Sequence, residues 1–263
     1  MGTTNPFAFN SFVALHDQDW LERQRVAGKV NAGALTLLEN EVNGGTTKTL
    51  LELDRLVGTY IRDNGCEPTF YLYKGFPANC CMSTGQKLVH GIPNDYVLQE
   101  GDKVSFDLGC TFKSAISDSA ITLIVGTPKS SAHVKLIKDT EDALTKGIES
   151  IAVGRQLGII GSSIYRVAKD NGYGCIVNYG GHGLSWDTPH ASPFVHNKSE
   201  PNEGIRITNG LCIAIEPMFT SGSTKTRVDK DGWTVWCDAD MVSHCEHSIY
   251  IHDDHVEIIT ARN

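Results

Sequence analysis

The sequence lacks both an excess of basic residues and any long apolar run. Its 23 Lys and Arg are outnumbered by 31 Asp and Glu, which gives a formal net charge of −8 at pH 7. A nucleic-acid partner held by charge is therefore not expected. The longest apolar runs, such as Leu211–Ile215, are far too short to span a bilayer, and the N-terminal stretch lacks the basic and apolar segments of a signal peptide. These absences predict a cytoplasmic protein with no membrane partner.

Several common catalytic motifs are also missing. The chain contains no H-E-x-x-H, no G-x-S-x-G, no P-loop and no G-x-G-x-x-G after a predicted strand, so none of the activities tied to those motifs is indicated. It has eight cysteines but no C-x-x-C pair, and we expect reduced thiols rather than a disulfide framework. A thiol nucleophile, Cys80 or Cys81 paired with His90, is a disfavoured alternative.

The chain does contain two similar series of predicted elements. Apolar spacing predicts a helix over Trp20–Val42 with Asp19 as its cap, and a second helix over 49–65 that ends on Asn64-Gly65. Strands are predicted in 103–109 and 120–126. The order then recurs, with helices over 134–154 and 157–172 and strands over 211–216, 233–237 and 241–252.

This weak internal duplication predicts one α+β domain, 1–263, built from related halves at about 12–126 and 127–260. Two such halves most economically share one sheet, with the helices covering one side. The stretch Gly181–Asn197, GHGLSWDTPHASPFVHN, falls outside this pattern because its Gly and Pro residues disfavour long helices and strands. We expect a loop there, and its three histidines need a separate explanation.

Two aspartates lie in neighbouring predicted strands. Asp107 in VSFDLG and Asp118 in SDSAITLIV fall opposite each other if the hairpin loop is centred on Phe112-Lys113. Directly opposed residues point to the same face with Cβ atoms about 4.5–5.5 Å apart, where two carboxylates repel each other. A bound cation would reverse the sign of that interaction. The alternative is a pair of solvated aspartates near strand ends.

The second half supplies three further candidates. Glu216 ends the apolar strand LCIAIE, Glu246 lies within VSHCEHSIYI, and His182 lies between glycines in GGHGLS. Each alone could be an ordinary solvated carboxylate or structural histidine. Together with Asp107 and Asp118 they form a set of mostly oxygen donors, which suits Mn, Fe(II), Co or a catalytic Zn pair. Four negative charges balance two divalent cations, as in two-metal hydrolytic sites.

The order and spacing of several motifs resemble those of the type I methionine aminopeptidases. The motifs are YKGFPANCCMS, VHGIP, GDKVSFDLG, SDSAITLIVG, GGHG, AIEPMF, KDGWTV and CEHSI. The resemblance covers nearly the whole chain. It implies the pita-bread fold, in which two pseudo-symmetric halves share a curved, mostly antiparallel sheet flanked by helices.

The resemblance implies a set of metal ligands. The ligand order of the family, Asp, Asp, His, Glu, Glu, falls on Asp107, Asp118, His182, Glu216 and Glu246. Asp118 and Glu246 would bridge two divalent metal ions. Asp107 would chelate one of the ions, and His182 and Glu216 would complete the other. These are the five residues that charge and spacing had already singled out.

The resemblance also implies catalytic and substrate-binding residues. Glu216 would move the proton, while His90 and His190 would orient the peptide beside the scissile bond. A pocket would surround the unbranched thioether side chain of methionine, since aromatic and sulfur surfaces suit that group. The wall positions of this pocket are matched by Tyr73, Phe76, Cys81 and Trp233, with Phe70 and Tyr179 nearby.

The implied activity is metal-dependent removal of the N-terminal methionine from nascent proteins whose second residue is small. A metal-bridging hydroxide would attack the methionine carbonyl. The chain itself begins Met1-Gly2, so the expectation applies to its own N-terminus. Nascent chains would be the partners of a monomer, with the ribosome as a candidate docking partner. The alternatives are an Xaa-Pro aminopeptidase or dipeptidase, which generally carries a large N-terminal domain, and a non-catalytic binding protein of the same fold.

The chain departs from the family pattern at a few positions. One extra residue separates His182 from His190, and the neighbours of His190 differ from the usual Phe and Glu. The placement of His190 and the fit of the second substrate residue depend on how this insertion is accommodated. Gly85 replaces an Asn near a monovalent-cation site, so no such cation is expected, and Lys74 stands where a His is common beside the pocket.

Overall fold

The computed structural model describes residues 13–262, so the Met1-Gly2 start lies outside the described residues. The first half follows the predicted order of two helices and then strands. Its elements are α1 Gln18–Asn43, α2 Leu50–Asp63, β1 Glu67–Pro68, the 3₁₀ turn η1 Tyr73–Gly75, β2 Cys81–Thr84, β3 Lys87–Val89, β4 Lys103–Phe112 and β5 Ala115–Ile124.

The second half repeats that order with shorter strands. Its elements are α3 Ser131–Glu149, α4 Gly158–Asn171, β6 Gly174–Cys175, β7 Gly181–Ser185, β8 Thr188–Val195, β9 Cys212–Ile215, β10 Met218–Thr220, β11 Thr226–Val228, β12 Val235–Cys237, β13 Val242–His244, β14 His247–His252 and β15 His255–Ile258.

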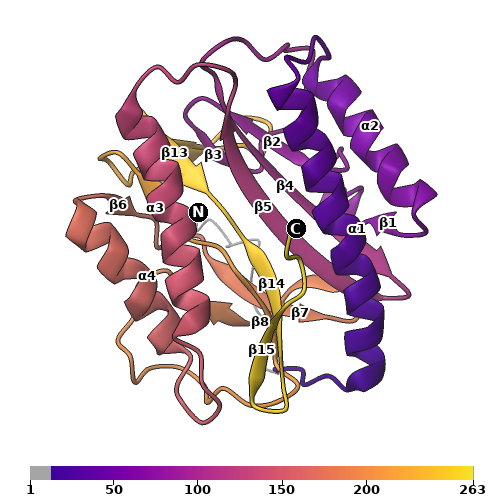
Figure 1. Cartoon of the computed structure of the whole chain (residues 1–263), viewed down its shortest axis with the longest axis vertical. Coiled ribbons are helices and arrows are strands. Elements are labelled where there is room, and N and C mark those ends of the chain that lie inside the picture. The colour runs from indigo at the N-terminus through magenta and orange to yellow at the C-terminus, as the bar shows by residue number, and fades with distance from the viewer. Residues whose placement is uncertain (1–12, 263) are drawn as a thin grey trace.

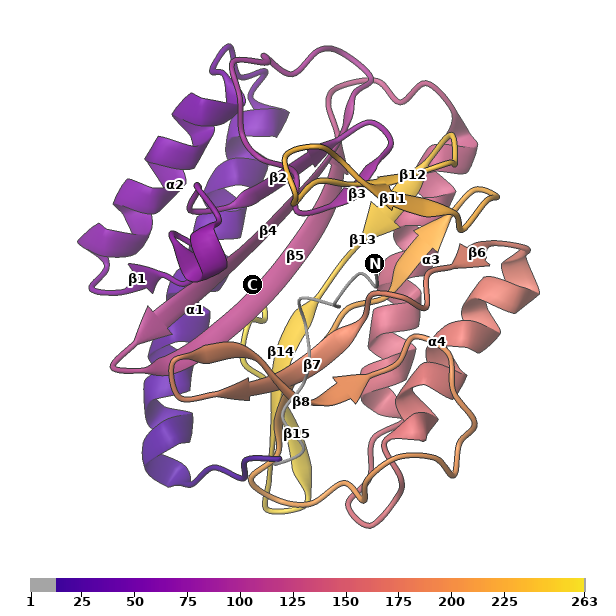
Figure 2. The same cartoon turned by 180° about the vertical axis from the view of Figure 1, so that it is seen from behind.

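The helices of both halves lie on one side of the strands, as the two opposite views show (Figures 1 and 2). The cap of α1 is Asp17, whose side chain accepts a hydrogen bond from the Trp20 amide at 3.1 Å. The prediction that Asp19 caps this helix is wrong. Asp19 lies within the first turn, and its carboxylate pairs with the guanidinium of Arg23 at 2.7 Å. Within residues 13–262, no helix combines the length and the apolarity that are needed to cross a bilayer.

Each helix pair packs on a hydrophobic core of its own. In the first half, Leu38 of α1 and Val57 of α2 are fully buried against Phe106 of β4 and its neighbours. In the second half, Ile164 of α4 packs with Ile213 of β9 in a similar cluster. The apolar faces of the amphipathic helices therefore fix each pair onto its own strands, and the opposite side of the strands carries the polar residues described below.

The two halves meet where β5 runs beside the C-terminal strands (Figure 2). The predicted strand over 241–252 is interrupted at Cys245-Glu246, between β13 and β14. At this break, Glu246 exchanges backbone hydrogen bonds with Ala120 of β5, at 3.0 and 3.4 Å. The side-chain hydroxyl of Ser248 adds a bond to each backbone group of Asp118, both at 2.7 Å. The sheet is therefore joined across the halves through a short irregular stretch rather than a regular ladder.

The turn of the β4–β5 hairpin lies at a different position from the predicted one. Lys113 and Ser114 form a two-residue connection with φ of +47° and +70°, the backbone conformation that suits tight hairpins. Asp107 is therefore paired with Ala120, and the predicted direct opposition of Asp107 and Asp118 is wrong. Because the displacement is two residues, both aspartates still point to the same face and lie diagonally across it.

The stretch expected to be a loop forms the β7–β8 hairpin instead. The pairing is irregular, with register shifts on both sides of Gly183. A Cβ at Gly181 would lie 2.2 Å from a carbonyl oxygen of β9, and one at Gly183 would lie 2.0 Å from a carbonyl oxygen of β8. The glycines on which the prediction of a loop was based therefore allow these strands to approach each other closely.

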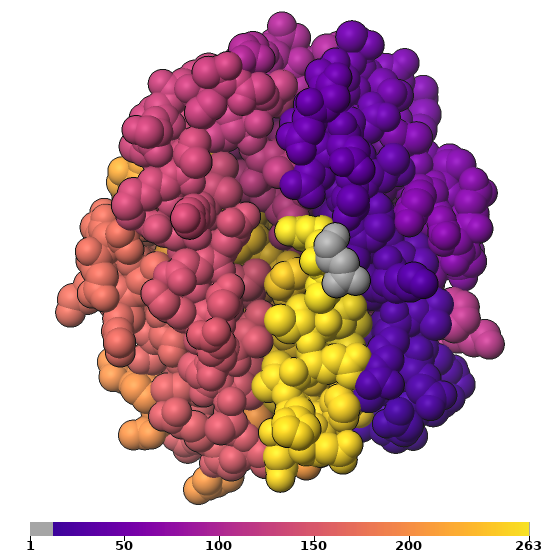
Figure 3. All heavy atoms as spheres, viewed as in Figure 1, coloured from indigo at the N-terminus to yellow at the C-terminus, as the bar shows by residue number. Residues whose placement is uncertain are grey.

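The C-terminal segment fills the space between α1 and the second helix pair (Figure 3). This packing makes Gly28 of α1 a sensitive position, because a Cβ there would lie 2.2 Å from the carbonyl oxygen of Ile259. Helix propensity favours Gly28→Ala by about 1 kcal/mol. The steric clash should exceed that gain, and we predict a net loss of about 1–3 kcal/mol in the free energy of unfolding. Urea denaturation measures it.

The matched control for this substitution is Lys29→Ala, at the exposed neighbouring position of the same helix. It should change the free energy of unfolding by less than about 0.5 kcal/mol. A Gly28→Ala protein that is as stable as the parent would show that α1 does not pack on Ile259 as described.

Candidate active site

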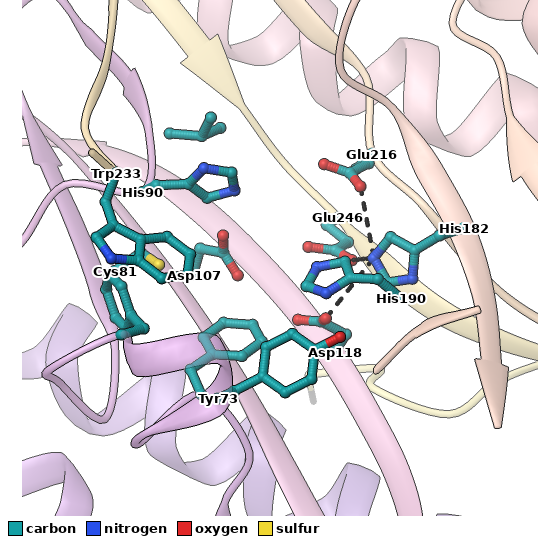
Figure 4. A pocket seen from close by; sticks show the side chains of 13 residues that line it. Tyr73, Cys81, His90, Asp107, Asp118, His182, His190, Glu216, Trp233 and Glu246 are labelled. Atoms are coloured by element: carbon teal, nitrogen blue, oxygen red, sulfur yellow. Dashed lines mark ion pairs between the residues drawn. The ribbon is translucent and has the colours of Figure 1, made fainter. Parts of the chain in front are cut away.

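Five side chains that the sequence singles out converge in one buried cavity (Figure 4). They come from separate segments, namely β4, β5, β7, the residue after β9 and the break between β13 and β14. Each is at most 9% exposed, so none is a solvated surface charge. The five residues are Asp107, Asp118, His182, Glu216 and Glu246.

The donor atoms form three groups, and two of these groups share Glu246. In one group, single atoms of His182, Glu216 and Glu246 all lie within 4.8 Å of one another. In the other, atoms of Asp107, Asp118 and Glu246 meet the same limit. The Nε2 atom of His182 lies 3.6 Å from Glu216 Oε1, 3.8 Å from Asp118 Oδ2 and 4.0 Å from Glu246 Oε1. The third group joins Asp118 with His182 and His190. The division of the five donors into two ligand sets stays a prediction.

Burial sets the protonation of the carboxylates. It raises the pKa of Asp107 to about 7, and with the negative charge of the neighbouring carboxylates it raises the pKa of Asp118 and Glu246 well above their usual range. Burial also acts to raise the pKa of Glu216, but the adjacent imidazoles, above all His244, bring that pKa below its usual value. A buried cluster of this kind is costly unless cations or protons neutralise it.

The donor set fits divalent cations. Among residues 13–262, no group hydrogen-bonds the buried oxygens Asp107 Oδ1, Asp118 Oδ1 or Glu246 Oε1. Buried polar atoms normally have a partner, so orphaned oxygens that point into a common cavity call for one. Carboxylate oxygens with a single imidazole are the ligands that Mn, Fe(II), Co and catalytic Zn accept.

Two further histidines line the cavity beside this cluster. His90 has a φ of +56°, an uncommon conformation for a residue other than glycine, and burial lowers its pKa to about 4. The ring of His190 lies 4.6 Å from the ring of His182, centroid to centroid. The pKa of His190 is also well below its ordinary value because of burial. The pairing of β7 with β8 is irregular, and His190 of β8 lines the cavity.

One residue of this centre was not predicted from the sequence. His244 is 1% exposed, and its Nε2 atom lies 3.3 Å from Glu216 Oε2 and 3.9 Å from Glu246 Oε2. Its backbone is held by the hydroxyl of Thr122, which donates to the His244 carbonyl at 2.6 Å. The sequence contains one indication of this role, because His244 lies two residues before Glu246 and on the same face of a predicted strand.

The predicted pocket for an apolar side chain adjoins the carboxylates. Cys81 of β2 pairs directly with Asp107 of β4, which places the pocket wall against the cluster. Phe76 and Trp233 pack edge to face, with centroids 5.2 Å apart. The cavity lining contains five of the six predicted pocket residues, Phe70, Tyr73, Phe76, Cys81 and Trp233. Tyr179 lines the adjoining cleft, on the other side of His90.

The cysteines have the state expected of reduced thiols. All eight are buried and free of disulfides. Burial raises the pKa of Cys80 and Cys81 well above the ordinary thiol value, and the negative charge of Asp107 acts in the same direction. Both thiols are therefore protonated at neutral pH, and the alternative of a thiolate nucleophile receives no support.

Comparison with known proteins agrees with this geometry. Residues 22–256 match the family described as Metallopeptidase family M24. A methionine aminopeptidase of Mycoplasma capricolum subsp. capricolum is 37% identical over 249 residues, which cover 94% of this chain and 98% of that protein. The crystal structure of a methionine aminopeptidase from Thermotoga maritima is similar with a TM-score of 0.91 and 30% identity, covering 95% of this chain and 100% of that one.

A more distant likeness concerns the fold alone. The prolidase from Pyrococcus furiosus has a TM-score of 0.76 at 20% sequence identity, with 95% of this chain and 66% of that chain covered. The α+β pita-bread fold and the family predicted from the sequence are confirmed by these comparisons.

The raised carboxylate pKa values make metal binding dependent on pH. In the metal-free protein their contribution to stability is present below the unfolded pKa, about 4, and is lost as the pH rises through about 7 for Asp107. A cation must displace the protons held at low pH, so the apparent affinity should rise up to about tenfold per pH unit for each proton released. We predict that Mn²⁺ raises the Tm more at pH 8 than at pH 6.

The measurement is thermal unfolding with and without Mn²⁺ at each pH, and only the difference is compared. The effect of titrating other histidines and lysines on the Tm then cancels, because it is present with and without Mn²⁺. Asp118→Asn should lose most of the response to Mn²⁺, whereas Asp142→Asn, whose side chain on α3 is 45% exposed, should keep it. A gain in Tm that shrinks as the pH rises would contradict the assignment of these carboxylates.

Proposed function

The chain belongs to metallopeptidase family M24, and we propose that it is a methionyl aminopeptidase, which hydrolyses the first peptide bond of chains that begin with methionine. The observation that carries the proposal is the placement of an aromatic and sulfur-lined pocket directly beside a buried cluster of metal-binding donors. The pocket would hold the methionine side chain, and the cluster would lie at the scissile carbonyl. Curated relatives named methionine aminopeptidase support the same activity.

We propose that the cluster holds two divalent ions. Asp107 would bind one of them, His182 and Glu216 would bind the other, and Asp118 with Glu246 would bridge the pair. The sharing of Glu246 by two of the donor groups supports this division. When bound, the ions would supply Lewis acidity to the substrate carbonyl and an activated water. The identity of the metal follows from availability, since such oxygen-rich sites accept several ions.

The residues of the chain itself would then perform the proton transfer and the orientation. The lowered pKa of Glu216 keeps its carboxylate ionised, so it can accept a proton from the attacking water and pass it to the departing amide nitrogen. His244, 3.3 Å from Glu216 Oε2, would hold that carboxylate in place. His90 and His190, both neutral because of burial, would donate hydrogen bonds that orient the peptide.

The shape of the site favours a small second residue in the substrate. The adjoining cleft is lined by residues that include His90, Tyr179 and Met218, and its volume is about 50 Å³. A glycine, alanine or serine fits such a space more readily than a long side chain. Nascent chains would then be the physiological substrates, at the ribosome and in the cytoplasm.

The competing assignment is an Xaa-Pro peptidase of the same fold. Likeness to the prolidase from Pyrococcus furiosus is limited to 20% identity, against 37% for the methionine aminopeptidase of Mycoplasma capricolum. A non-catalytic binding role would not require the five donors, and all five are present and buried. The methionine-directed activity therefore has the stronger support.

The assay that tests this proposal uses metal-depleted protein on Met-Gly, Met-Pro and Xaa-Pro peptides, with Mn²⁺, Fe²⁺ or Co²⁺ restored. We expect release of free methionine only after a metal is added. Glu216→Gln keeps the size of the side chain but removes the proton acceptor, and should lower kcat about 10²–10⁴-fold.

Glu216→Gln protein purified in the same way also controls for a contaminating peptidase. Methionine release by that variant at the parental rate would mean that the activity comes from elsewhere. Cleavage of the Xaa-Pro peptides alone would favour the competing assignment, and no cleavage with any metal would reject both.

A further inference from the structure

A second, larger groove opens beside the buried cavity. It shares two lining residues with that cavity, Tyr73 and His190, so the two spaces adjoin each other at these side chains. The outer groove has a volume of about 550 Å³, compared with about 50 Å³ for the inner cavity. The inner space suits a single side chain, whereas the outer one is in the size range of sites that bind extended ligands.

The lining of the outer groove differs in charge from the rest of the protein. The whole chain has 31 acidic residues and a net charge of −8, yet none of the described residues that line this groove is Asp or Glu. Its charged lining residue is Lys74, whose ammonium lies 5.4 Å from the ring centroid of Tyr73. Two carboxylates lie near the lining in sequence: that of Asp17 is used to cap α1, and Asp187 is an exposed residue between Trp186 and Thr188. The groove therefore favours a ligand that is apolar or negatively charged.

One wall of the groove is formed by side chains that pack against the buried Trp20. Trp186, at the turn between β7 and β8, is 41% exposed and packs edge to face on the buried Trp20, with centroids 4.6 Å apart. His16 stacks on the same Trp20 at 3.8 Å, and one of its ring nitrogens lies 2.9 Å from the carbonyl oxygen of Leu184. A wall that is already ordered costs a ligand little entropy on binding.

We propose that this outer groove binds the substrate residues that follow the second one, and that Lys74 gives a preference for an acidic side chain among the third to fifth residues. The inference rests on the proposed function, because that function places the start of the peptide in the inner cavity. His190 lines the inner cavity, the cleft for the second residue and the groove, so a peptide that continues past His190 would reach the groove. There, the apolar wall covers its backbone and Lys74 attracts a carboxylate.

The test compares kcat/KM for pentapeptides Met-Gly-Xaa-Xaa-Xaa in which one of the last three residues is Asp, Ala or Lys. Interactions between exposed charges are modest, so we expect the best Asp peptide to exceed its Lys counterpart by about two- to fivefold. The preference should weaken between 20 and 300 mM KCl, because salt screens exposed charges. The amide of Met-Gly-Gly, which carries no carboxylate and ends before most of the groove, serves as the reference substrate, and the pentapeptides are amidated in the same way.

The decisive variant is Lys74→Glu, which should reverse the preference and favour the Lys peptide, while Lys74→Gln should abolish it. The matched control is Lys138→Glu, an equal change of charge at an exposed position of α3, on the side of the helices. That variant should behave like the parent. Each preference is expressed relative to the rate of the same protein on the Met-Gly-Gly amide, so that any effect of a Lys74 substitution on the adjoining pocket cancels.

Two results would overturn this inference while leaving the proposed function intact. One is equal kcat/KM for the Asp and Lys pentapeptides in the parent protein, with normal cleavage of the Met-Gly-Gly amide. The other is an acidic preference that persists unchanged in Lys74→Glu. Failure to cleave the Met-Gly-Gly amide with any metal would instead reject the proposed function itself, and the two failures are therefore distinguishable.

Discussion

Four buried carboxylates repel one another at the centre of this structure, so cations or protons must neutralise them. Asp107, Asp118, Glu216 and Glu246 share one water-poor cavity, where unlike charges attract and like charges repel far more strongly than in solvent. Without cations the cluster must hold protons, as the raised pKa of three of the four shows. The cost of gathering these groups is the reason to regard the cavity as a metal centre rather than a polar patch of the core.

The fold brings the carboxylates together by joining its two halves at their most irregular point. Each half has its own helix pair and core, so each could supply donors only from its own strands. The break at Cys245-Glu246 lets β5 and the C-terminal strands exchange backbone hydrogen bonds without a full ladder. Glu246 leaves the regular strand there, and its side chain serves two of the donor groups.

Much of this could be predicted from the sequence, because charge and periodicity are local signals. The helices, the five donors and the side of the sheet on which the aspartates lie follow from spacing, and a register displaced by two residues preserves the face. The β7–β8 hairpin could not be predicted, since its glycines have a tertiary cause, the close approach of neighbouring strands. The role of His244 was missed because its closer partner, Glu216, belongs to another strand, and its place two residues before Glu246 was the only local signal.

The order of the donors along the chain has a consequence for synthesis. Asp107 and Asp118 belong to the first half, whereas Glu246 lies beyond almost all of the remaining strands. A growing polypeptide that has been translated through β5 can complete its first core while it holds only two of the donors. The cluster of donors can therefore be completed only late in synthesis, after the segment that carries Glu246 has been made.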